Sequence, residues 1–419
     1  MIKQERLLII SNNVLSTTNN NGKTILSCID SIPQDQVQQL YFSNETPTVS
    51  GYRYFKISDT DVIRTRFMGV APGTSIAECD ANDTNPQKRR VSLIKRNSVS
   101  LMLRNALWSN AWKSDALFKW LDDFNPTVVL FVAGDCLFAY EICKFIKNKY
   151  KTRLCVYVTD DYVMPRTSDK YCDRRLRNRI RSVLHDMLKE TNVFFTISET
   201  MKTDYKKLFG KDSHLLFNMT DSLRISDYST SKDDYPIVFS YTGSLYYGRD
   251  IVLNRIGRII NEYNCKAGMI KGVLNIYSNS SQEKAKINEN SGCRLCGSLN
   301  LNGLKETLNK SDVLVFVESS DPKYIEKTKY SFSTKIPEYL SVGRLILAVG
   351  PQNVSSISYL EDCAICESNF DNLEQTINDI ISNRARREEY AEKALKKYED
   401  KHNRSNMQQV FIDKVMGAK

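Results

Sequence analysis

Short apolar runs alternate with segments of helical periodicity along the whole chain, and this alternation constrains the fold more than any other feature. Between positions 174 and 188, for example, apolar residues recur at the spacing of one helix face. Short apolar runs flanked by helices build parallel sheets from strand–helix–strand units, so the sequence predicts an α/β fold. The runs that we expect to be buried strands are 7–10, 128–132, 154–158, 193–197, 237–241, 273–277, 313–317 and 345–349.

The chain divides near its middle. Its 419 residues suffice for more than one domain, and a polar stretch rich in serine and aspartate, 222–234, separates two halves of similar pattern. We therefore expect two Rossmann-like, doubly wound domains, residues 1–225 and 235–400, that face each other across a cleft. Ligands bind at the carboxyl ends of the strands in such folds. The last helix, 404–419, follows a break and is expected to pack back on the first domain.

The net charge of +10 suits a nucleic acid, an anionic lipid surface or a phosphorylated substrate. No zinc-finger spacing, aromatic RNA-binding motif or heptad repeat is present, so we do not expect nucleic acid as a partner. No stretch approaches the roughly eighteen apolar residues of a membrane span, and the run 7–10 is too short for a signal peptide. We expect a cytoplasmic protein whose eleven cysteines are reduced. The lone pair Cys293 and Cys296 is weak evidence for zinc, and we expect neither metal nor cofactor.

The segment 331–343, Ser-Phe-Ser-Thr-Lys-Ile-Pro-Glu-Tyr-Leu-Ser-Val-Gly, carries the clearest chemical signal. Ser333 or Thr334 can cap a short helix, the proline falls in its first turn, and the final glycine suits its C-terminal end. The N-terminus of such a helix attracts anions. Lys335 and Glu338 share a face, so that one can meet a phosphate while the other accepts hydrogen bonds from hydroxyl groups. An ordinary surface helix with an ion pair is the alternative.

This segment resembles the signature helix of GT-B glycosyltransferases, in particular the large retaining family that builds bacterial polysaccharides. The usual pattern of that family is a Glu, seven residues and a second Glu, followed by small residues and Gly. Glu338 matches the second Glu, which the resemblance implies binds the ribose of the donor, whereas Tyr330 stands at the position of the first. A subset of capsule and O-antigen enzymes carries a Ser-x-Lys-x-x-Glu-Tyr form, to which 333–339 is similar.

Other segments resemble the same family in the same order. Gly243 and Ser244 match the loop whose backbone approaches the donor diphosphate, and Arg249 matches the basic residue that follows it. Asn279 lies in a loop that is beside the donor in relatives, and Ser298 lies in the segment whose backbone reads the base. The resemblance thus implies a donor site made of Gly243, Ser244, Arg249, Asn279, Ser298, Ser333, Thr334, Lys335 and Glu338.

The N-terminal half carries two further candidates. Gly22 and Lys23 resemble a Gly-rich loop that closes over a donor or acceptor phosphate, whereas a P-loop is excluded because Thr17 stands where its first Gly is required. Asp160 and Asp161 follow an expected strand, where many relatives carry a His-Asp pair. A carboxylate there can orient the acceptor hydroxyl or receive its proton, which makes both candidate catalytic residues. Capping of the next turn by one of the two is the alternative.

The stretch 88–112 interleaves basic with apolar residues and contains two tryptophans, Trp108 and Trp112, near its end. Such a segment can lie on an anionic membrane surface and present a lipid-linked acceptor. A solvated helix face is the alternative.

We therefore expect a retaining glycosyltransferase that moves a sugar from a nucleotide-diphosphate sugar to a glycan or lipid-linked glycan acceptor in polysaccharide biosynthesis. It would work in the cytoplasm, peripherally at the inner face of the membrane. One alternative is a catalytically silent protein that binds sugar nucleotides or acts as a scaffold, which the departure at Tyr330 favours. Another is a sugar-nucleotide epimerase on the same fold, although neither His185, His214 nor His402 follows an expected strand at the cleft.

Overall fold

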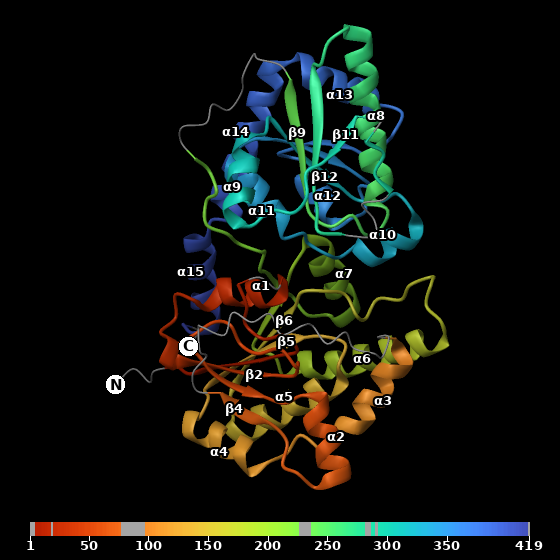
Figure 1. Ribbon diagram of the computed structural model, residues 1–419. Coiled ribbons are helices and arrows are strands. Elements are labelled where there is room, and N and C mark those ends of the chain that lie inside the picture. The colour runs from red at the N-terminus through yellow and green to blue at the C-terminus, as the bar shows by residue number, and fades with distance from the viewer. Residues whose placement is uncertain are drawn as a thin grey trace. The chain divides into compact units, whose positions relative to one another are not determined.

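The structure, a computed structural model, describes residues 5–17, 20–76, 97–225, 236–280, 286–289 and 292–417. The chain forms two compact units: Met1–Leu216 with Met407–Lys419, and Phe217–Asn406. It crosses between them twice, once into the second unit and once back near the C-terminus. Each unit has one sheet covered by helices (Figure 1). The predicted α/β class with two doubly wound sheets is confirmed.

The first unit is built on an eight-stranded sheet in the order β4-β3-β2-β1-β5-β6-β7-β8. Neighbouring strands are parallel except β4, which is antiparallel to β3 at the edge. The strand order reverses between β1 and β5, and ligands bind at the carboxyl ends of such strands. The strands are β1 (Leu7–Ser11), β2 (Val37–Tyr41), β3 (Arg53–Lys56), β4 (Thr74–Ile76), β5 (Val128–Ala133), β6 (Arg153–Val158), β7 (Val193–Thr196) and β8 (His214–Leu215).

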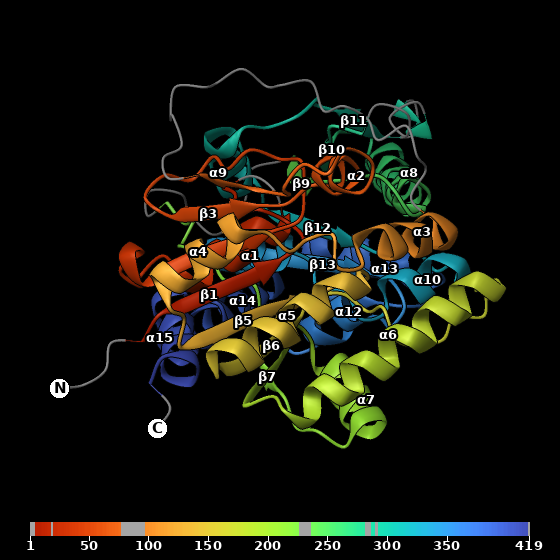
Figure 2. The ribbon, with the colours of Figure 1, turned by 90° about the horizontal axis from the view of Figure 1, so that it is seen from below.

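Helices cover this sheet. α5 (Leu137–Tyr150) contacts β1 and β5 and packs beside α6 (Tyr171–Lys189) (Figure 2). α15 (Arg404–Val415) adds the last residues of the chain to the unit: the Phe411 ring lies 5.9 Å from that of Phe195, and Gln408 Nε2 donates to the Ser27 carbonyl at 2.7 Å. The other helices are α1 (Asn20–Ile29), the 3-10 helix η1 (Gln34–Gln36), α2 (Asp59–Met68), α3 (Ser98–Trp108), α4 (Asp115–Phe124), α5 (Leu137–Tyr150), α6 (Tyr171–Lys189) and α7 (Glu199–Phe209).

One face of α3 is anchored to the first unit by a partly buried ion pair. Arg104 Nε donates to Asp59 Oδ1 at 2.7 Å, and its Nη2 donates to the Phe42 carbonyl at 3.1 Å, just beyond the end of β2. Trp108, one turn further along the helix, donates to the same Asp59 oxygen at 2.7 Å and stacks on Phe138 with ring centroids 3.8 Å apart. This face of α3 therefore points away from solvent.

The second unit is built on a six-stranded sheet in the order β11-β10-β9-β12-β13-β14, with all pairs parallel. The strands are β9 (Ile237–Thr242), β10 (Gly272–Tyr277), β11 (Cys293–Leu295), β12 (Val313–Val317), β13 (Leu345–Val349) and β14 (Ile365–Glu367). The helices are α8 (Arg249–Ala267), α9 (Leu301–Lys310), α10 (Pro322–Thr328), α11 (Lys335–Val342), α12 (Ser355–Leu360), α13 (Leu373–Ser382) and α14 (Arg384–Lys401).

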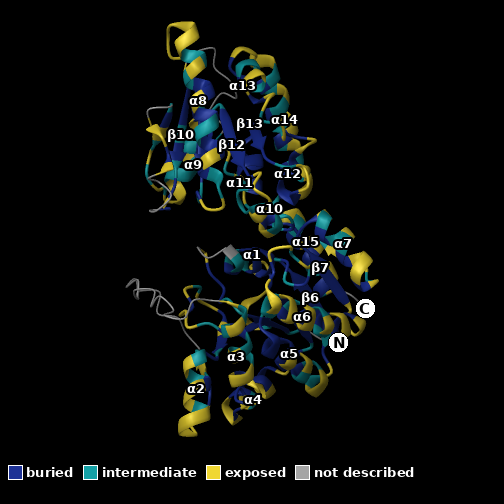
Figure 3. Ribbon diagram, turned by 90° about the vertical axis from the view of Figure 1, so that its right-hand side faces the viewer, coloured by how far each residue is buried: buried dark blue, intermediate teal, exposed yellow. Residues whose placement is uncertain are grey.

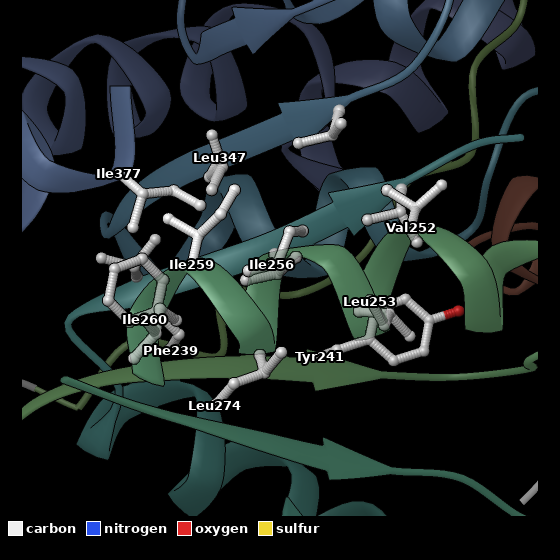
Figure 4. Packing of buried hydrophobic residues seen from close by; sticks show 14 of the residues in the cluster. Phe239, Tyr241, Val252, Leu253, Ile256, Ile259, Ile260, Leu274, Leu347 and Ile377 are labelled. Carbon is white, nitrogen blue, oxygen red and sulfur yellow. The ribbon is translucent and has the colours of Figure 1, made fainter. Parts of the chain in front are cut away.

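The core of the second unit lies between its sheet and α8. Apolar residues of α8 recur at helical spacing and point at the strands, among them Leu253, Ile256 and Ile260 (Figure 4). They meet alternate residues of β9, Phe239 and Tyr241, because successive strand residues point to opposite faces. Since α8 follows β9 through a short loop and packs along it, the N-terminus of α8 lies near the carboxyl end of β9.

Burial follows the same layers in both units: the central strands are buried, whereas β4 and β8 at the edges of the first sheet are partly exposed. On the helices, the exposed residues lie on the outer sides (Figure 3). In the part of the chain that the structure describes, no helix combines the length and the hydrophobicity that crossing a bilayer requires.

A ring cluster fixes the segment that leads into α11. The imidazole of His402 stacks on Phe332 with ring centroids 5.8 Å apart. Its Nε2 lies 2.8 Å from the Tyr359 hydroxyl, and its Nδ1 lies 2.7 Å from the Asn218 carbonyl oxygen. Burial lowers the pKa of His402 to about 4, so the ring is neutral at physiological pH. The cluster thereby holds the residue directly before Ser333 in place.

Candidate functional site

Helix α11 begins and ends where its sequence predicts. Thr334 occupies the N-cap position of the helix but makes no capping hydrogen bond with its side chain. The Ser333 hydroxyl instead accepts a hydrogen bond from the Lys335 N–H at 3.3 Å. Gly343 adopts the left-handed conformation at φ +64°, which ends the helix. The predicted helix, its start and its C-terminal glycine are confirmed.

A buried tyrosine ties α11 to the sheet. The Tyr339 hydroxyl accepts a hydrogen bond from the N–H of Thr242, the last residue of β9, at 3.0 Å. It also donates to the carbonyl oxygen of Val315 in β12 at 3.4 Å. Lys335 lies one turn before Tyr339 on the same helix face. The first turn of α11 therefore lies at the carboxyl ends of β9 and β12.

The loops after β9, β10 and β11 are joined to one another. The Gly243 N–H donates to the Tyr277 carbonyl at 2.8 Å, and the Leu245 N–H donates to the Ser280 hydroxyl at 3.1 Å. The Ser278 N–H in turn donates to the Gly297 carbonyl at 2.6 Å. These bonds bring two further predicted donor residues, the exposed Asn279 and Ser298, to the edge of the sheet that carries Gly243 and Ser244.

The ammonium group of Lys335 lies against two aromatic rings. Its Nζ is 4.4 Å from the ring centroid of Tyr241 and 5.5 Å from that of Phe316, and it donates to the Tyr241 hydroxyl at 3.3 Å. Gly243 makes room for it: a Cβ at this position would lie 2.9 Å from Nζ, and φ is +136°. Only glycine satisfies both conditions without strain.

A second cation lies in the first turn of α8. Arg249 Nη2 donates to both oxygens of Glu318, at 2.9 and 3.1 Å. The carboxylate side chain is almost fully buried and that of Arg249 is largely so. Burial alone would lower the pKa of Arg249, but the adjacent Glu318 raises it above its ordinary value. Arg249 is therefore a permanent positive charge at this edge of the sheet.

The surroundings of Lys335 make its proton labile. Burial, followed by the charge of Arg249, lowers the pKa of Lys335 to about 7. Glu318 and Glu338 oppose the shift. The residue as a whole is only partly buried, so a ligand or a small reagent can reach it. The arrangement can bind a doubly or triply charged anion between a fixed and an adjustable cation.

The two predicted catalytic carboxylates of the first unit differ in their surroundings. Asp161 Oδ1 accepts hydrogen bonds from the Val163 N–H at 3.1 Å, the Met164 N–H at 3.0 Å and the Tyr205 hydroxyl at 2.9 Å. Asp161 is thus the residue that caps the next turn. Asp160 is only partly buried at the end of β6, and burial followed by the charge of Asp161 raises its pKa to about 6.

The predicted phosphate loop at Gly22 and Lys23 lies within the first turn of α1 instead of ahead of it. Asparagine and glycine favour turns, so the sequence predicts a loop there. A Cβ on Gly22 would lie 2.4 Å from the Val14 carbonyl oxygen, so glycine is required for the close approach of α1 to the preceding loop. Packing explains Gly22 without a ligand.

The basic stretch 88–112 is described only in part, because residues 88–96 lie outside the described residues. In the rest, Arg104 and the two tryptophans are turned into the first unit, and Trp108 and Trp112 are buried. The two tryptophan side chains therefore cannot meet a membrane. The exposed apolar residues of α3 are others, which include Val99 and Leu103.

No family model matches the chain, and no curated protein sequence matches it. Solved structures match it over almost its whole length. HepE from Anabaena in complex with UDP has a TM-score of 0.64 at 9% identity, over 99% of this chain and 100% of that chain. Sucrose-phosphate synthase from Thermosynechococcus elongatus has a TM-score of 0.59 at 10% identity, over 97% of each chain. A glycosyltransferase from Rickettsia africae has a TM-score of 0.60 at 10% identity, over 99% of this chain and 100% of that chain. The chain has the GT-B fold.

The carboxylate that accepts hydrogen bonds from Arg249, and whose charge also acts on Lys335, is Glu318, which is not among the residues predicted from the sequence. Tyr330, at the position of the usual first Glu, is buried with the Lys329 ammonium 4.9 Å from its ring centroid. Glu318 instead follows directly on β12. A signal was present: an acidic residue placed immediately after the apolar run 313–317 lies at the carboxyl end of a strand, where ligands bind.

We predict that acetic anhydride acetylates Lys335 at a rate that rises with pH around a midpoint near its pKa of about 7. Only the neutral amine reacts, and a lowered pKa means that the neutral form dominates above that midpoint. Peptide mass spectrometry after brief labelling across the pH range would measure the rate. The exposed Lys266, whose pKa is raised by its hydrogen bond to Glu374, is the internal control. If the acetylation rates of Lys335 and Lys266 depend on pH in the same way, the pKa of Lys335 is not lowered and the prediction is wrong.

Proposed function

We propose that this protein is a glycosyltransferase that moves a sugar from a nucleotide-diphosphate sugar to a glycan or lipid-linked glycan acceptor in polysaccharide biosynthesis. The observation that most supports the proposal is the pair of cations Arg249 and Lys335, beside the close backbone of Gly243 at the carboxyl end of β9. Such a set suits a diphosphate. A structure of HepE, which shares the fold, is in complex with UDP-glucose and supports a uridine nucleotide as the first donor to test.

The chemistry follows from charge. The bond between the sugar and the diphosphate breaks, and the leaving diphosphate gains negative charge in the transition state. Arg249, Lys335 and the first turns of α8 and α11 are already in place before the reaction, so they stabilise that charge without reorganisation. Glu338, in the first turn of α11, is assigned to the ribose hydroxyls. Retention of configuration rests on the resemblance of the 333–343 segment, and the anomeric coupling of the first-formed product in a proton NMR spectrum would test it.

The donor site is tested by calorimetric titration with UDP and UDP-glucose. We expect Arg249→Met and Lys335→Met each to weaken binding of UDP by about tenfold or more, because each removes a charge-assisted contact to the diphosphate. Lys266→Met, an exposed change on α8, is the matched control and should bind UDP like the wild type.

Failure of the wild type to bind UDP or any other nucleoside diphosphate and its sugar would refute the proposal. Binding without transfer to any acceptor or hydrolysis of the donor would instead favour a catalytically silent protein.

Asp160 is the residue that we assign to the acceptor. Its pKa of about 6 leaves it ionised at neutral pH, where a carboxylate can orient the acceptor hydroxyl or take its proton. As the pH falls through about 6, protonation removes this base. We expect turnover to fall on the acid side around that pH, and Asp160→Asn to lower kcat about a hundredfold with UDP affinity unchanged. Steady-state kinetics across the pH range would measure both effects, and Asp123→Asn, at an exposed aspartate of α4, is the control. Turnover of Asp160→Asn at the wild-type rate would exclude the role of Asp160 toward the acceptor.

We also propose that the first unit meets the cytoplasmic face of an anionic membrane, where a lipid-linked acceptor is found. From the predicted stretch 88–112, the exposed Leu103 would contact the membrane, in place of the buried Trp108 and Trp112. Phe67 at the end of α2 is 78% exposed and Leu103 of α3 is 63% exposed. The two helices are adjacent, since Arg66 Nε donates to the Leu107 carbonyl at 3.0 Å. Arg64 and Arg66 are exposed on α2 and add positive charge for anionic headgroups.

Sedimentation with phospholipid vesicles tests this surface. We expect the protein to bind vesicles that contain phosphatidylglycerol better than neutral ones, and Phe67→Ser and Leu103→Ser each to reduce binding severalfold. Leu208→Ser, at an exposed leucine of α7, is the matched control. Equal binding of all four proteins, or of none, would exclude a membrane contact at α2 and α3.

A further inference from the structure

Glu318 is a buried carboxylate in the middle of the proposed donor site. Its N–H donates to the Val349 carbonyl oxygen of β13 at 2.9 Å, which fixes the backbone between β12 and β13. Its side chain is 4% exposed. Carboxylates are rarely buried to this extent unless a cation compensates their charge. The position of Glu318 is therefore coupled to the cations around it.

Only some of the N–H donors of its main partner, Arg249, are used in the contact with Glu318. A single terminal nitrogen of the guanidinium serves both oxygens of Glu318. Arg249 Nε is buried and has no hydrogen-bond partner among the described residues. A guanidinium has five N–H donors in a rigid plane, which suits two-point binding of an oxyanion. The unused donor capacity points to an additional anion beside Glu318.

Glu318 also acts on the second cation. The negative charge of Glu318 favours the protonated form of Lys335, whereas Arg249 disfavours it. The carboxylate therefore lies in the field of both cations and compensates part of their mutual repulsion. In the absence of a ligand it allows two positive groups to remain close to each other.

Catalysis changes the charge at this place. When the bond between the sugar and the diphosphate oxygen breaks, the electron pair stays on the oxygen. The nucleoside diphosphate product then carries one more negative charge than the sugar donor. A fixed carboxylate repels the product more strongly than the donor.

We propose that Glu318 is a counter-anion of the diphosphate site, which holds Arg249 in place while the site is empty and selectively weakens the binding of the nucleoside diphosphate product. The proposal rests on the proposed function. It makes Glu318 a positioning residue that favours product release, and it predicts a difference between two ligands that a purely structural residue would not produce.

Calorimetric titration of wild type, Glu318→Gln and Glu318→Asp with UDP and UDP-glucose provides the test. The glutamine keeps the shape and removes the charge, and the aspartate keeps the charge. We expect Glu318→Gln to bind UDP about tenfold more tightly than the wild type, with a clearly smaller gain for UDP-glucose. Glu318→Asp should discriminate between the ligands as the wild type does, and Glu262→Gln, at an exposed glutamate of α8, is the control.

Two results would overturn the proposal while leaving the proposed function intact. In one, Glu318→Gln weakens UDP-glucose alone, which would make Glu318 a sugar contact. In the other, it weakens both ligands equally, which would make its role structural. A wild type that binds neither ligand, nor any other nucleoside diphosphate or its sugar, removes both proposals. If Glu318→Gln does not fold, the test uses the affinities of the wild type. A wild type that binds UDP more than about tenfold more tightly than UDP-glucose would exclude the role of Glu318 as a counter-anion.

Discussion

Two positive charges that lie close together at a partly buried site need a negative charge to compensate their repulsion, and the candidate site depends on this constraint. Arg249 cannot give up its proton under any ordinary condition, so the adjustment falls on its neighbours. Glu318 supplies the compensating negative charge, whereas Lys335 can change its protonation state near neutral pH because its pKa is about 7. The pKa of Lys335 depends on both other groups, since Arg249 lowers it and Glu318 raises it.

The backbone makes this arrangement possible. The cations come from the first turns of α8 and α11, and both helices are held by contacts remote from the charges. α8 is held by its apolar face on the sheet, and α11 by the Tyr339 hydroxyl and the ring cluster around His402. Gly243 leaves the space into which Lys335 projects. Two helices that are packed on the sheet thus carry the two cations at their first residues.

The parts that the sequence predicts are those determined by local pattern. The strand at 237–242 and the helix at 335–342 follow from apolar runs, a capping serine and a terminal glycine, all within a few residues of one another. The pairing of Arg249 with Glu318 spans 69 positions and depends on β12 lying beside β9, which no local pattern specifies. The same holds for Asp161, whose partner Tyr205 is 44 positions away. On α3 the apolar residues surround the helix, so periodicity did not reveal that Arg104 and Trp108 face inward.

The return of the chain to the first unit has a consequence for biosynthesis. α15 carries Gln408 and Phe411, which contact Ser27 of α1 and Phe195 of β7. These contacts can form only when α15 has left the ribosome, after the second unit has been translated. The first unit therefore begins to fold early but acquires its final layer last, and until then the surfaces around Ser27 and Phe195 stay uncovered in the nascent chain.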